Sequence, residues 1–173
     1  MFTVAKRLPP SANILEIGCY LGRSTASFAS GCVGTNKRVY SIDIFGGLYQ
    51  DVINDSDLRE AFGSDFFEKW RRNMKDAGVA DYVLPLKGDS KNIAQIWRAP
   101  IHLLFIDGSH VYDDIIADFN NFFTYVVSGG IVAFHDVLPA WSGVYKVWHD
   151  VAKYQLVRIG NCDSICYGSK PSE

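Results

Sequence analysis

The fold is decided by one stretch near the start of the chain, Asn13-Ile14-Leu15-Glu16-Ile17-Gly18-Cys19-Tyr20-Leu21-Gly22-Arg23-Ser24. Its first five residues form a short apolar run that ends at a glycine, which predicts a buried β-strand. Two glycines then allow a tight turn, and residues 24–30 predict a helix directly after it. A strand that passes through a glycine turn into a helix is typical of a parallel sheet covered by helices.

The same alternation of strand and helix continues along the rest of the chain. Further strands are predicted at residues 38–42, 82–86, 101–106 and 131–134, and helices near 66–77, 90–97, 115–127 and 144–151. The last two predicted strands, 154–159 and 164–167, are close enough in sequence to form an antiparallel hairpin. The sequence therefore predicts an α/β fold in a single domain over residues 1–173, with a doubly wound, mostly parallel sheet and a C-terminal antiparallel hairpin.

Composition argues against several classes of partner. The formal net charge is −2 without a basic tail or stripe, so a nucleic acid is not indicated, and the pairs Lys37-Arg38 and Arg71-Arg72 are expected to be solvated surface. No stretch approaches the roughly 20 apolar residues that span a bilayer, and the first residues lack the apolar core of a signal peptide. The four cysteines form no C-x-x-C pair. We therefore expect a cytoplasmic protein with reduced thiols and no membrane partner, and a homo-oligomer stays open.

Polar residues follow the predicted strands, which is where ligands bind in open parallel sheets. The turn that contains Gly18 and Gly22 lets a ligand approach the backbone, and the helix after it offers free N–H groups to an anion. Asp43 follows the second strand, where a carboxylate can accept hydrogen bonds from the hydroxyls of a ribose. Asp89 and Ser90 follow the third strand, where polar side chains can contact an adenine edge, and Ser90 can also cap the next helix.

A second polar group follows the fourth and fifth strands. Asp107 and Asp136 are expected to converge, because sequential parallel strands usually lie close together. Two carboxylates without a nearby Lys or Arg repel each other unless a cation or a proton lies between them, and oxygen ligands favour Mg²⁺. The neighbouring His110 and His135 would admit Mn²⁺ or Fe²⁺ instead, and His110 is placed to act as a general base. The alternative is that both aspartates only cap helices.

These motifs resemble those of class I S-adenosylmethionine-dependent methyltransferases. The resemblance covers roughly residues 12–152 and is carried by residues 14–24, by residues 105–112 with Asp118, and by residues 129–136. Within that class the chain is similar to small bacterial O-methyltransferases related to macrolide-sugar O-methyltransferases and to cephalosporin hydroxylase-like proteins, and more distantly to catechol O-methyltransferase. The resemblance implies a Rossmann-like fold and metal-assisted methylation of a small hydroxylated acceptor, such as a sugar or a natural product.

The resemblance also implies a role for each matching residue. The residues that would hold S-adenosylmethionine are Glu16, Gly18, Tyr20, Ser24, Asp43, Asp89, Ser90 and Asp107. Of these, Gly18, Tyr20 and Ser24 would contact its methionine part. Asp43 would bind its ribose, and Asp89 and Ser90 would contact its adenine. Asp107 and Asp136 would ligate Mg²⁺ or another divalent cation, and Asp107 and His110 would be catalytic, His110 as the base. His135 replaces an acidic residue of catechol-type enzymes, so their third carboxylate ligand has no counterpart.

The acceptor side is less well defined by the sequence. Few residues precede the first strand, whereas relatives carry an N-terminal cap over the substrate pocket. We therefore expect a pocket that is open, completed by residues 44–63, or supplied by a partner subunit, with Phe45, Tyr49 or Trp141 as its lining. Two other functions stay open, namely methylation of a nitrogen or of a macromolecule, and a non-catalytic module that binds a cofactor or a partner.

Overall fold

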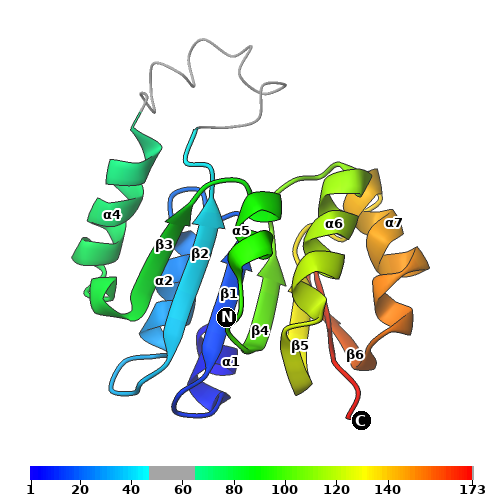
Figure 1. Ribbon diagram of the computed structural model, residues 1–173, viewed down its shortest axis with the longest axis horizontal. Coiled ribbons are helices and arrows are strands. Elements are labelled where there is room, and N and C mark those ends of the chain that lie inside the picture. Colours follow the sequence, from blue (N-terminus) through cyan, green and yellow to red (C-terminus); the bar gives the residue numbers. More distant parts are fainter. Residues whose placement is uncertain (47–64, 173) are drawn as a thin grey trace.

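The computed structural model describes residues 1–46 and 65–172, and one seven-stranded sheet forms its centre (Figure 1). The strands are β1 (Asn13–Ile17), β2 (Arg38–Asp43), β3 (Val83–Lys87), β4 (Ile101–Ile106), β5 (Val126–Phe134), β6 (Val157–Cys162) and β7 (Ile165–Ser169). They lie in the order β3-β2-β1-β4-β5-β7-β6, and among these described strands β7 alone runs opposite to the direction of the others. The predicted mostly parallel sheet with a C-terminal antiparallel hairpin is therefore confirmed.

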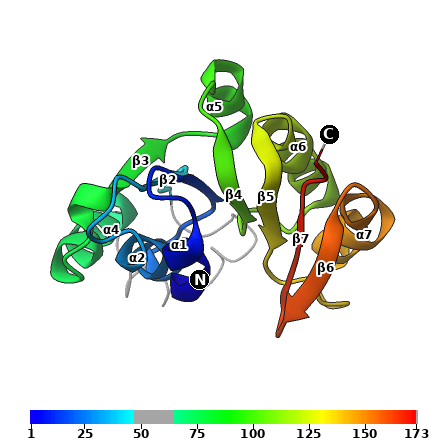
Figure 2. The same ribbon diagram turned by 90° about the horizontal axis from the view of Figure 1, so that it is seen from below.

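Helices cover both faces of this sheet (Figure 2). They are α1 (Phe2–Arg7), α2 (Arg23–Ser30), α4 (Phe66–Asp76), α5 (Ser90–Ile96), α6 (Tyr112–Phe123) and α7 (Ser142–Asp150), with short 3-10 turns η1 (Ala80–Tyr82) and η2 (Ala152–Tyr154). One buried cluster lies beneath α1, α2 and α4, and a second lies beneath α5, α6 and α7. No helix in residues 1–46 and 65–172 is long and apolar enough to cross a membrane.

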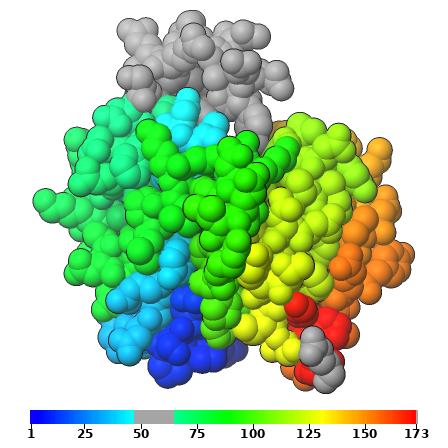
Figure 3. Space-filling model, viewed as in Figure 1, coloured from blue at the N-terminus to red at the C-terminus, as the bar shows by residue number. Residues whose placement is uncertain are grey.

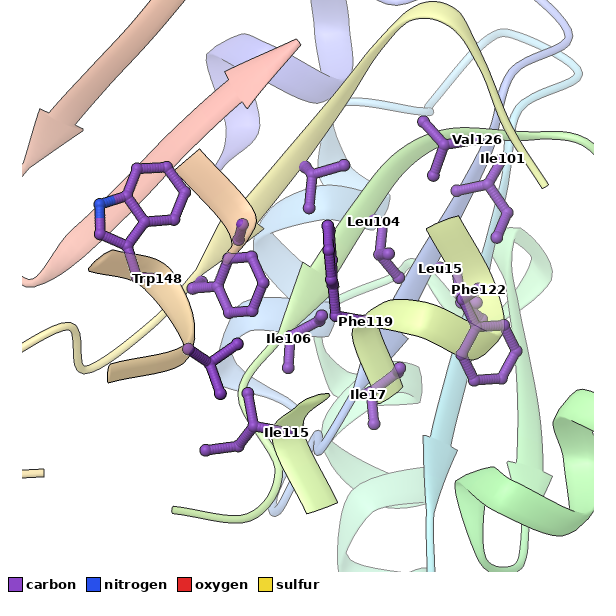
Figure 4. Close-up of a cluster of buried hydrophobic side chains, with 14 of the residues drawn as sticks. Leu15, Ile17, Ile101, Leu104, Ile106, Ile115, Phe119, Phe122, Val126 and Trp148 are labelled. Atoms are coloured by element: carbon purple, nitrogen blue, oxygen red, sulfur yellow. The ribbon is translucent and has the colours of Figure 1, made fainter. Parts of the chain in front are cut away.

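Strands β1, β2, β4 and β5 contribute buried residues to both clusters, because successive side chains point to opposite faces of a sheet. In β1, Leu15 and Ile17 belong to the cluster beneath α5–α7, whereas Ile14 belongs to the cluster beneath α1, α2 and α4. Figure 4 shows Phe119 and Phe122 of α6 packed among the strand residues of the cluster beneath α5–α7. This double burial fixes the strands, and it therefore fixes the loops that leave their carboxyl ends.

The order of the strands reverses direction at β1. β1 pairs with β2 on one side and with β4 on the other, both in parallel. The carboxyl ends of these strands meet at the upper edge of the sheet in Figure 1. In open α/β sheets, ligands bind outside this edge at the point of reversal. The fold thus places the loops after β1 and β4 where a ligand site is expected.

Two local predictions are wrong. β5 begins at Val126 rather than at residue 131, and α6 ends at Phe123, so Val126 and Val127 are strand residues. Their spacing continues the helical pattern, but both are β-branched, and Val126 pairs with Ile101 of β4. The helix α5 is capped by the Asp89 side chain, which accepts a hydrogen bond from the backbone N–H of Lys91. Ser90, expected as the cap, is instead the first residue of the helix.

Lys37 also differs from its prediction as solvated surface. Only 2% of the residue is exposed. Its Nζ donates to the backbone oxygen of Lys6, at 3.1 Å, and to that of Gly31, at 3.4 Å. These carbonyls lie at the ends of α1 and α2, where unpaired acceptors and the negative end of the helix dipole attract a cation. The buried ammonium group therefore joins the ends of two helices.

Candidate active site

The turn after β1 passes directly against the loop after β4. Gly18 has a φ of 82°, and a Cβ atom at this position would collide with the carbonyl oxygen of Asp107. Gly22, with a φ of 88°, is the N-cap of α2 and leaves the first N–H groups of that helix without side-chain partners. The two glycines that the sequence singled out therefore serve different purposes. Gly18 permits close packing of two loops, and Gly22 begins a helix at the carboxyl edge of the sheet.

Asp43 holds this turn in place from the neighbouring strand. Its Oδ2 accepts hydrogen bonds from the backbone N–H groups of Cys19, at 2.9 Å, and Tyr20, at 3.0 Å. Its Oδ1 accepts a third hydrogen bond, from Phe45 N at 2.8 Å. A carboxylate offers about four acceptor positions, so about one remains for a ligand in this arrangement. Asp43 therefore shapes the turn and keeps some capacity to accept a hydroxyl.

Glu16 is fully buried beneath the turn, and one of its carboxylate oxygens has no hydrogen-bond partner. Thr25 Oγ1 and Ser41 Oγ both donate to the other oxygen, Oε2, at 2.5 and 2.9 Å. Burial raises the pKa of Glu16 from 4.5 to about 7, although the hydroxyls of Ser24, Thr25 and Ser41 act in the opposite direction. An unpaired buried acceptor of this kind costs about 1–3 kcal/mol. The orphaned Oε1 lies beneath the turn that the sequence assigns to a cofactor.

Asp107, His135 and Asp136 meet at the ends of β4 and β5. Each offers one ligand atom, and these three atoms lie within 4.8 Å of one another. His135 Nδ1 lies 3.1 Å from Asp107 Oδ1 and 3.1 Å from Asp136 Oδ1, but it forms a well-shaped hydrogen bond with neither. Contact with the Asp107 carboxylate raises the pKa of His135 to about 9, and Asp136 adds to this while burial opposes it. The predicted convergence of Asp107 and Asp136 is thus observed, with an imidazole between them.

His110 lies at the side of this group. Its Nε2 is 3.2 Å from Asp136 Oδ2, and its ring stacks on Trp141 with the ring centroids 4.1 Å apart. The backbone at His110 is also fixed, because Gly143 of α7 packs so closely that a Cβ there would collide with the His110 carbonyl oxygen. The buried Ser109 hydroxyl donates to Asp114 Oδ2 at 2.9 Å. These contacts orient an imidazole toward the aspartates from a rigid loop.

Asp89 and Ser90 lie at the start of α5, and the turn before them is tied to Asp43. The N–H of Gly88 donates to the backbone oxygen of Asp43 at 2.9 Å. Ser90 Oγ donates to Asp118 Oδ1 of α6 at 2.5 Å, and Asp118 is only 3% exposed. The predicted adenine residues and the predicted ribose residue are therefore neighbours, and a buried carboxylate supports one of them.

Backbone strain is concentrated at the same edge. Among the described non-glycine residues, five have positive φ, and three of these lie in loops at this edge: Tyr20 at 47°, Phe45 at 49° and Asp136 at 57°. Each conformation costs roughly 1–2 kcal/mol for a residue with a Cβ atom. Strain of this size persists where the surrounding structure holds it, commonly at binding sites. Asp43 holds the backbone at Tyr20 and Phe45 through the hydrogen bonds described above.

Sequence reasoning missed two residues of this site and misplaced one. His135 was considered only as a neighbour that would admit Mn²⁺ or Fe²⁺, and the assigned metal ligands were Asp107 and Asp136 alone. Asp118 was given no role, although an acidic residue between Ile115 and Phe119 on an apolar helix face is itself a signal. Phe45 is 5% exposed, so its expected place in an open acceptor pocket is wrong, whereas Trp141 is 43% exposed. Tyr49 and residues 47–63 lie outside the described residues.

A family profile described as a methyltransferase domain matches residues 15–137. This range includes all the residues predicted to bind a cofactor or a metal or to act in catalysis. The match therefore covers the whole carboxyl edge from β1 to the end of β5.

Several solved structures are similar at low identity. One of them is TomG, an O-methyltransferase of tomaymycin synthesis from Streptomyces achromogenes, whose structure was solved in complex with SAM. It is 18% identical to this chain with a TM-score of 0.71, and the match covers 99% of this chain and 78% of TomG. CalS11, a TDP-rhamnose 3'-O-methyltransferase of calicheamicin biosynthesis, is 19% identical with a TM-score of 0.66, over 97% and 75%. A putative rRNA methylase from Clostridium thermocellum is 17% identical with a TM-score of 0.67, over 97% and 94%. These likenesses establish a shared fold.

Proposed function

The chain belongs to the methyltransferase family whose profile matches residues 15–137, and on that premise we propose that it transfers a methyl group from S-adenosylmethionine to a hydroxyl group of a small acceptor, with the help of a divalent cation. The observation that carries this proposal is the group formed by Asp107, His135 and Asp136, with His110 beside it. Methylation of a hydroxyl needs a means of lowering the pKa of that hydroxyl and a base to take its proton. This group offers both functions beside the turn after β1.

The cofactor is assigned to the loops after β1, β2 and β3. Glu16, Gly18, Tyr20 and Ser24 would face its methionine part. An ammonium group there would favour the ionised form of Glu16, whose orphaned Oε1 could then accept a hydrogen bond from it. Asp43 would accept a ribose hydroxyl, and Asp89 and Ser90 would contact the adenine. The backbone link between Gly88 and Asp43 supports this order, because ribose and adenine are adjacent parts of one molecule.

The metal is assigned to Asp107, His135 and Asp136. His135 Nδ1 fits such a role because it is buried, lacks a hydrogen bond and lies between two carboxylate oxygens. A bound cation would lower the pKa of an acceptor hydroxyl and orient it. Two oxygens and one imidazole nitrogen suit Mn²⁺ or Fe²⁺ better than Mg²⁺, which prefers oxygen ligands. We therefore name Mn²⁺ as the first cation to test and Mg²⁺ as the second.

His110 would take the proton from the acceptor. Its ring is held by the stack on Trp141 and by the contact between Nε2 and Asp136, so one face of the site has a fixed base. Trp141, which is 43% exposed, would extend this face with a flat apolar surface against which an acceptor ring can pack. Removal of a general base typically lowers turnover by about 10²–10⁴-fold.

The proposal is tested by calorimetric titration with S-adenosylmethionine, followed by turnover with a panel of sugars and phenols in Mn²⁺, Mg²⁺ or EDTA. We expect micromolar cofactor binding that Asp43→Asn weakens about tenfold or more, since a good acceptor is lost. Asp107→Asn should lower turnover at least about a hundredfold, because cation binding contributes several kcal/mol to such reactions. Asp113→Asn is the matched control, because Asp113 is exposed and lies outside the site. Full turnover in EDTA would refute the metal assignment, and absence of cofactor binding would refute the proposal.

A second candidate function is methylation of RNA. The putative rRNA methylase is similar over 94% of its own length, whereas TomG and CalS11 are longer than the region they share with this chain. The net charge of −2 argues against it, because binding to a phosphate backbone depends on basic residues. Methyl transfer to total RNA in the presence of EDTA, without transfer to any small hydroxylated acceptor, would favour this second function.

A further inference from the structure

Asp118 is a buried carboxylate outside the assigned catalytic and metal-binding group. It lies on α6 between Ile115 and Phe119, which pack against the sheet, and it is 3% exposed. α5 and α6 lie side by side on the surface in Figure 3, and the Ser90–Asp118 hydrogen bond joins them. A carboxylate on an apolar helix face is expensive to bury, so its partner is informative.

The hydrogen bond has a fixed direction. Burial raises the pKa of Asp118 to about 6, against the effect of the Ser90 hydroxyl, so the group is ionised at pH 8. An ionised carboxylate only accepts hydrogen bonds, whereas a serine hydroxyl has one donor hydrogen and two acceptor positions. The Ser90 hydrogen is therefore committed to Asp118 Oδ1, at 2.5 Å. The Ser90 oxygen can offer only lone pairs to anything else.

We propose that Asp118 is a positioning residue that fixes the polarity of Ser90, so that the site accepts a purine with a 6-amino group and disfavours a purine with a 6-oxo group. This inference rests on the proposed function, in which Ser90 contacts the adenine of the cofactor. The exocyclic amino group of adenine donates hydrogen bonds and so matches an oxygen that only accepts. The 6-oxo group of hypoxanthine is an acceptor and would face the lone pairs of Ser90 without a hydrogen between them.

The expected discrimination follows from the cost of an unmatched polar pair. A buried polar group left without a partner loses about 1–3 kcal/mol, and each 1.4 kcal/mol is tenfold in affinity. Ser90 is half-buried, so the lower part of that range applies. The wild-type protein should therefore prefer S-adenosylhomocysteine over S-inosylhomocysteine, its 6-oxo analogue, by about tenfold.

The experiment is calorimetric titration of the full chain at pH 8 with these two compounds, and its readout is the ratio of the two affinities. Asp118→Leu removes the acceptor and fills its space, so the Ser90 hydroxyl can turn outward and the ratio should fall to within about threefold. Ser90→Ala removes the discriminating oxygen and keeps the Asp118 side chain in α6, and the ratio should fall in the same way. Asp113→Leu, an exposed change on the same helix, should keep the wild-type ratio. Thermal melts identify any variant that fails to fold.

Each outcome has a distinct meaning. A ratio that falls in Asp118→Leu and Ser90→Ala but not in Asp113→Leu supports the proposal, because a merely structural role would weaken both compounds equally. Equal wild-type affinity for both compounds overturns it and leaves the proposed function intact. A wild-type ratio retained in Ser90→Ala also overturns it, even where Asp118→Leu does not fold. Failure of the wild-type protein to bind either compound refutes the proposed function itself, and the inference with it.

Discussion

Replacement of Glu16 by glutamine should change how the stability of the protein depends on pH. The Glu16 carboxyl is fully buried, and its pKa rises from 4.5 to about 7 on folding, chiefly through burial. A raised pKa means that the folded protein holds this proton more tightly than the unfolded chain does. The contribution to stability is therefore fully present below pH 4.5 and is lost as the pH rises through 7. At about 1.4 kcal/mol per unit of pKa, the whole loss is about 3 kcal/mol.

Glutamine keeps the shape of the side chain and an oxygen that can accept from Thr25 and Ser41, but it does not titrate. The assay is urea denaturation of wild-type protein and Glu16→Gln at half-unit steps from pH 5 to pH 8, with equal ionic strength. The free energy of unfolding of the wild-type protein should fall relative to that of the variant, by about 2–3 kcal/mol across this range. Other groups titrate in both proteins, so they cancel in the difference. Two parallel curves would refute the conclusion that Glu16 is protonated by its burial.

Three further predictions follow from contacts at and near the site. Gly18→Ala should lower the free energy of unfolding by more than about 2 kcal/mol, because backbone strain and a collision with the Asp107 carbonyl coincide at this position. The control Gly34→Ala, at a φ of 75° with open space around it, should lower it by only about 1–2 kcal/mol. Urea denaturation of both variants measures the two losses, and equal losses would contradict the collision. The affinity for Mn²⁺ should rise about tenfold per pH unit up to about pH 9, because the cation must displace the proton on His135. Calorimetric titrations with Mn²⁺ between pH 7 and pH 9 measure this, and an affinity that does not change with pH would be evidence against His135 as a ligand. Lys37→Met should lower the free energy of unfolding by about 1–3 kcal/mol, because it leaves carbonyl groups at two helix ends without their ammonium donor. Lys146→Met, at an exposed position, should change it very little, and thermal denaturation compares the two variants.

The sequence was sufficient to predict the bounds of two strands that are buried on both faces of the sheet. β1 and β4 begin and end at the predicted residues, because both runs are mostly apolar and each is followed by turn residues. The resemblance to S-adenosylmethionine-dependent methyltransferases is confirmed as well, through the family that matches residues 15–137. Both successes rest on short segments in which local pattern and fold agree.

The errors arose where contacts between distant segments decide the outcome. Val126 and Val127 fit the helical spacing of α6, and pairing with β4 draws this segment into the sheet. Lys37 looks solvated in sequence, yet one of its two backbone acceptors belongs to Lys6 at the end of α1, 31 residues away in the chain. The same is true of Asp118, whose partner Ser90 is 28 residues away. No local pattern carries information on such pairs.

His135 explains how the carboxyl edge can keep two converging aspartates without a neighbouring Lys or Arg. With a pKa of about 9, its imidazole is protonated at neutral pH and supplies the positive charge that Asp107 and Asp136 require. A divalent cation would replace this proton rather than fill an uncompensated site, so the fold tolerates both states. The strain at Asp136 and the orphaned Oε1 of Glu16 lie at this same edge. These features lower the stability of the folded protein at this edge. In the proposed function, a bound cofactor and a cation would offset that cost.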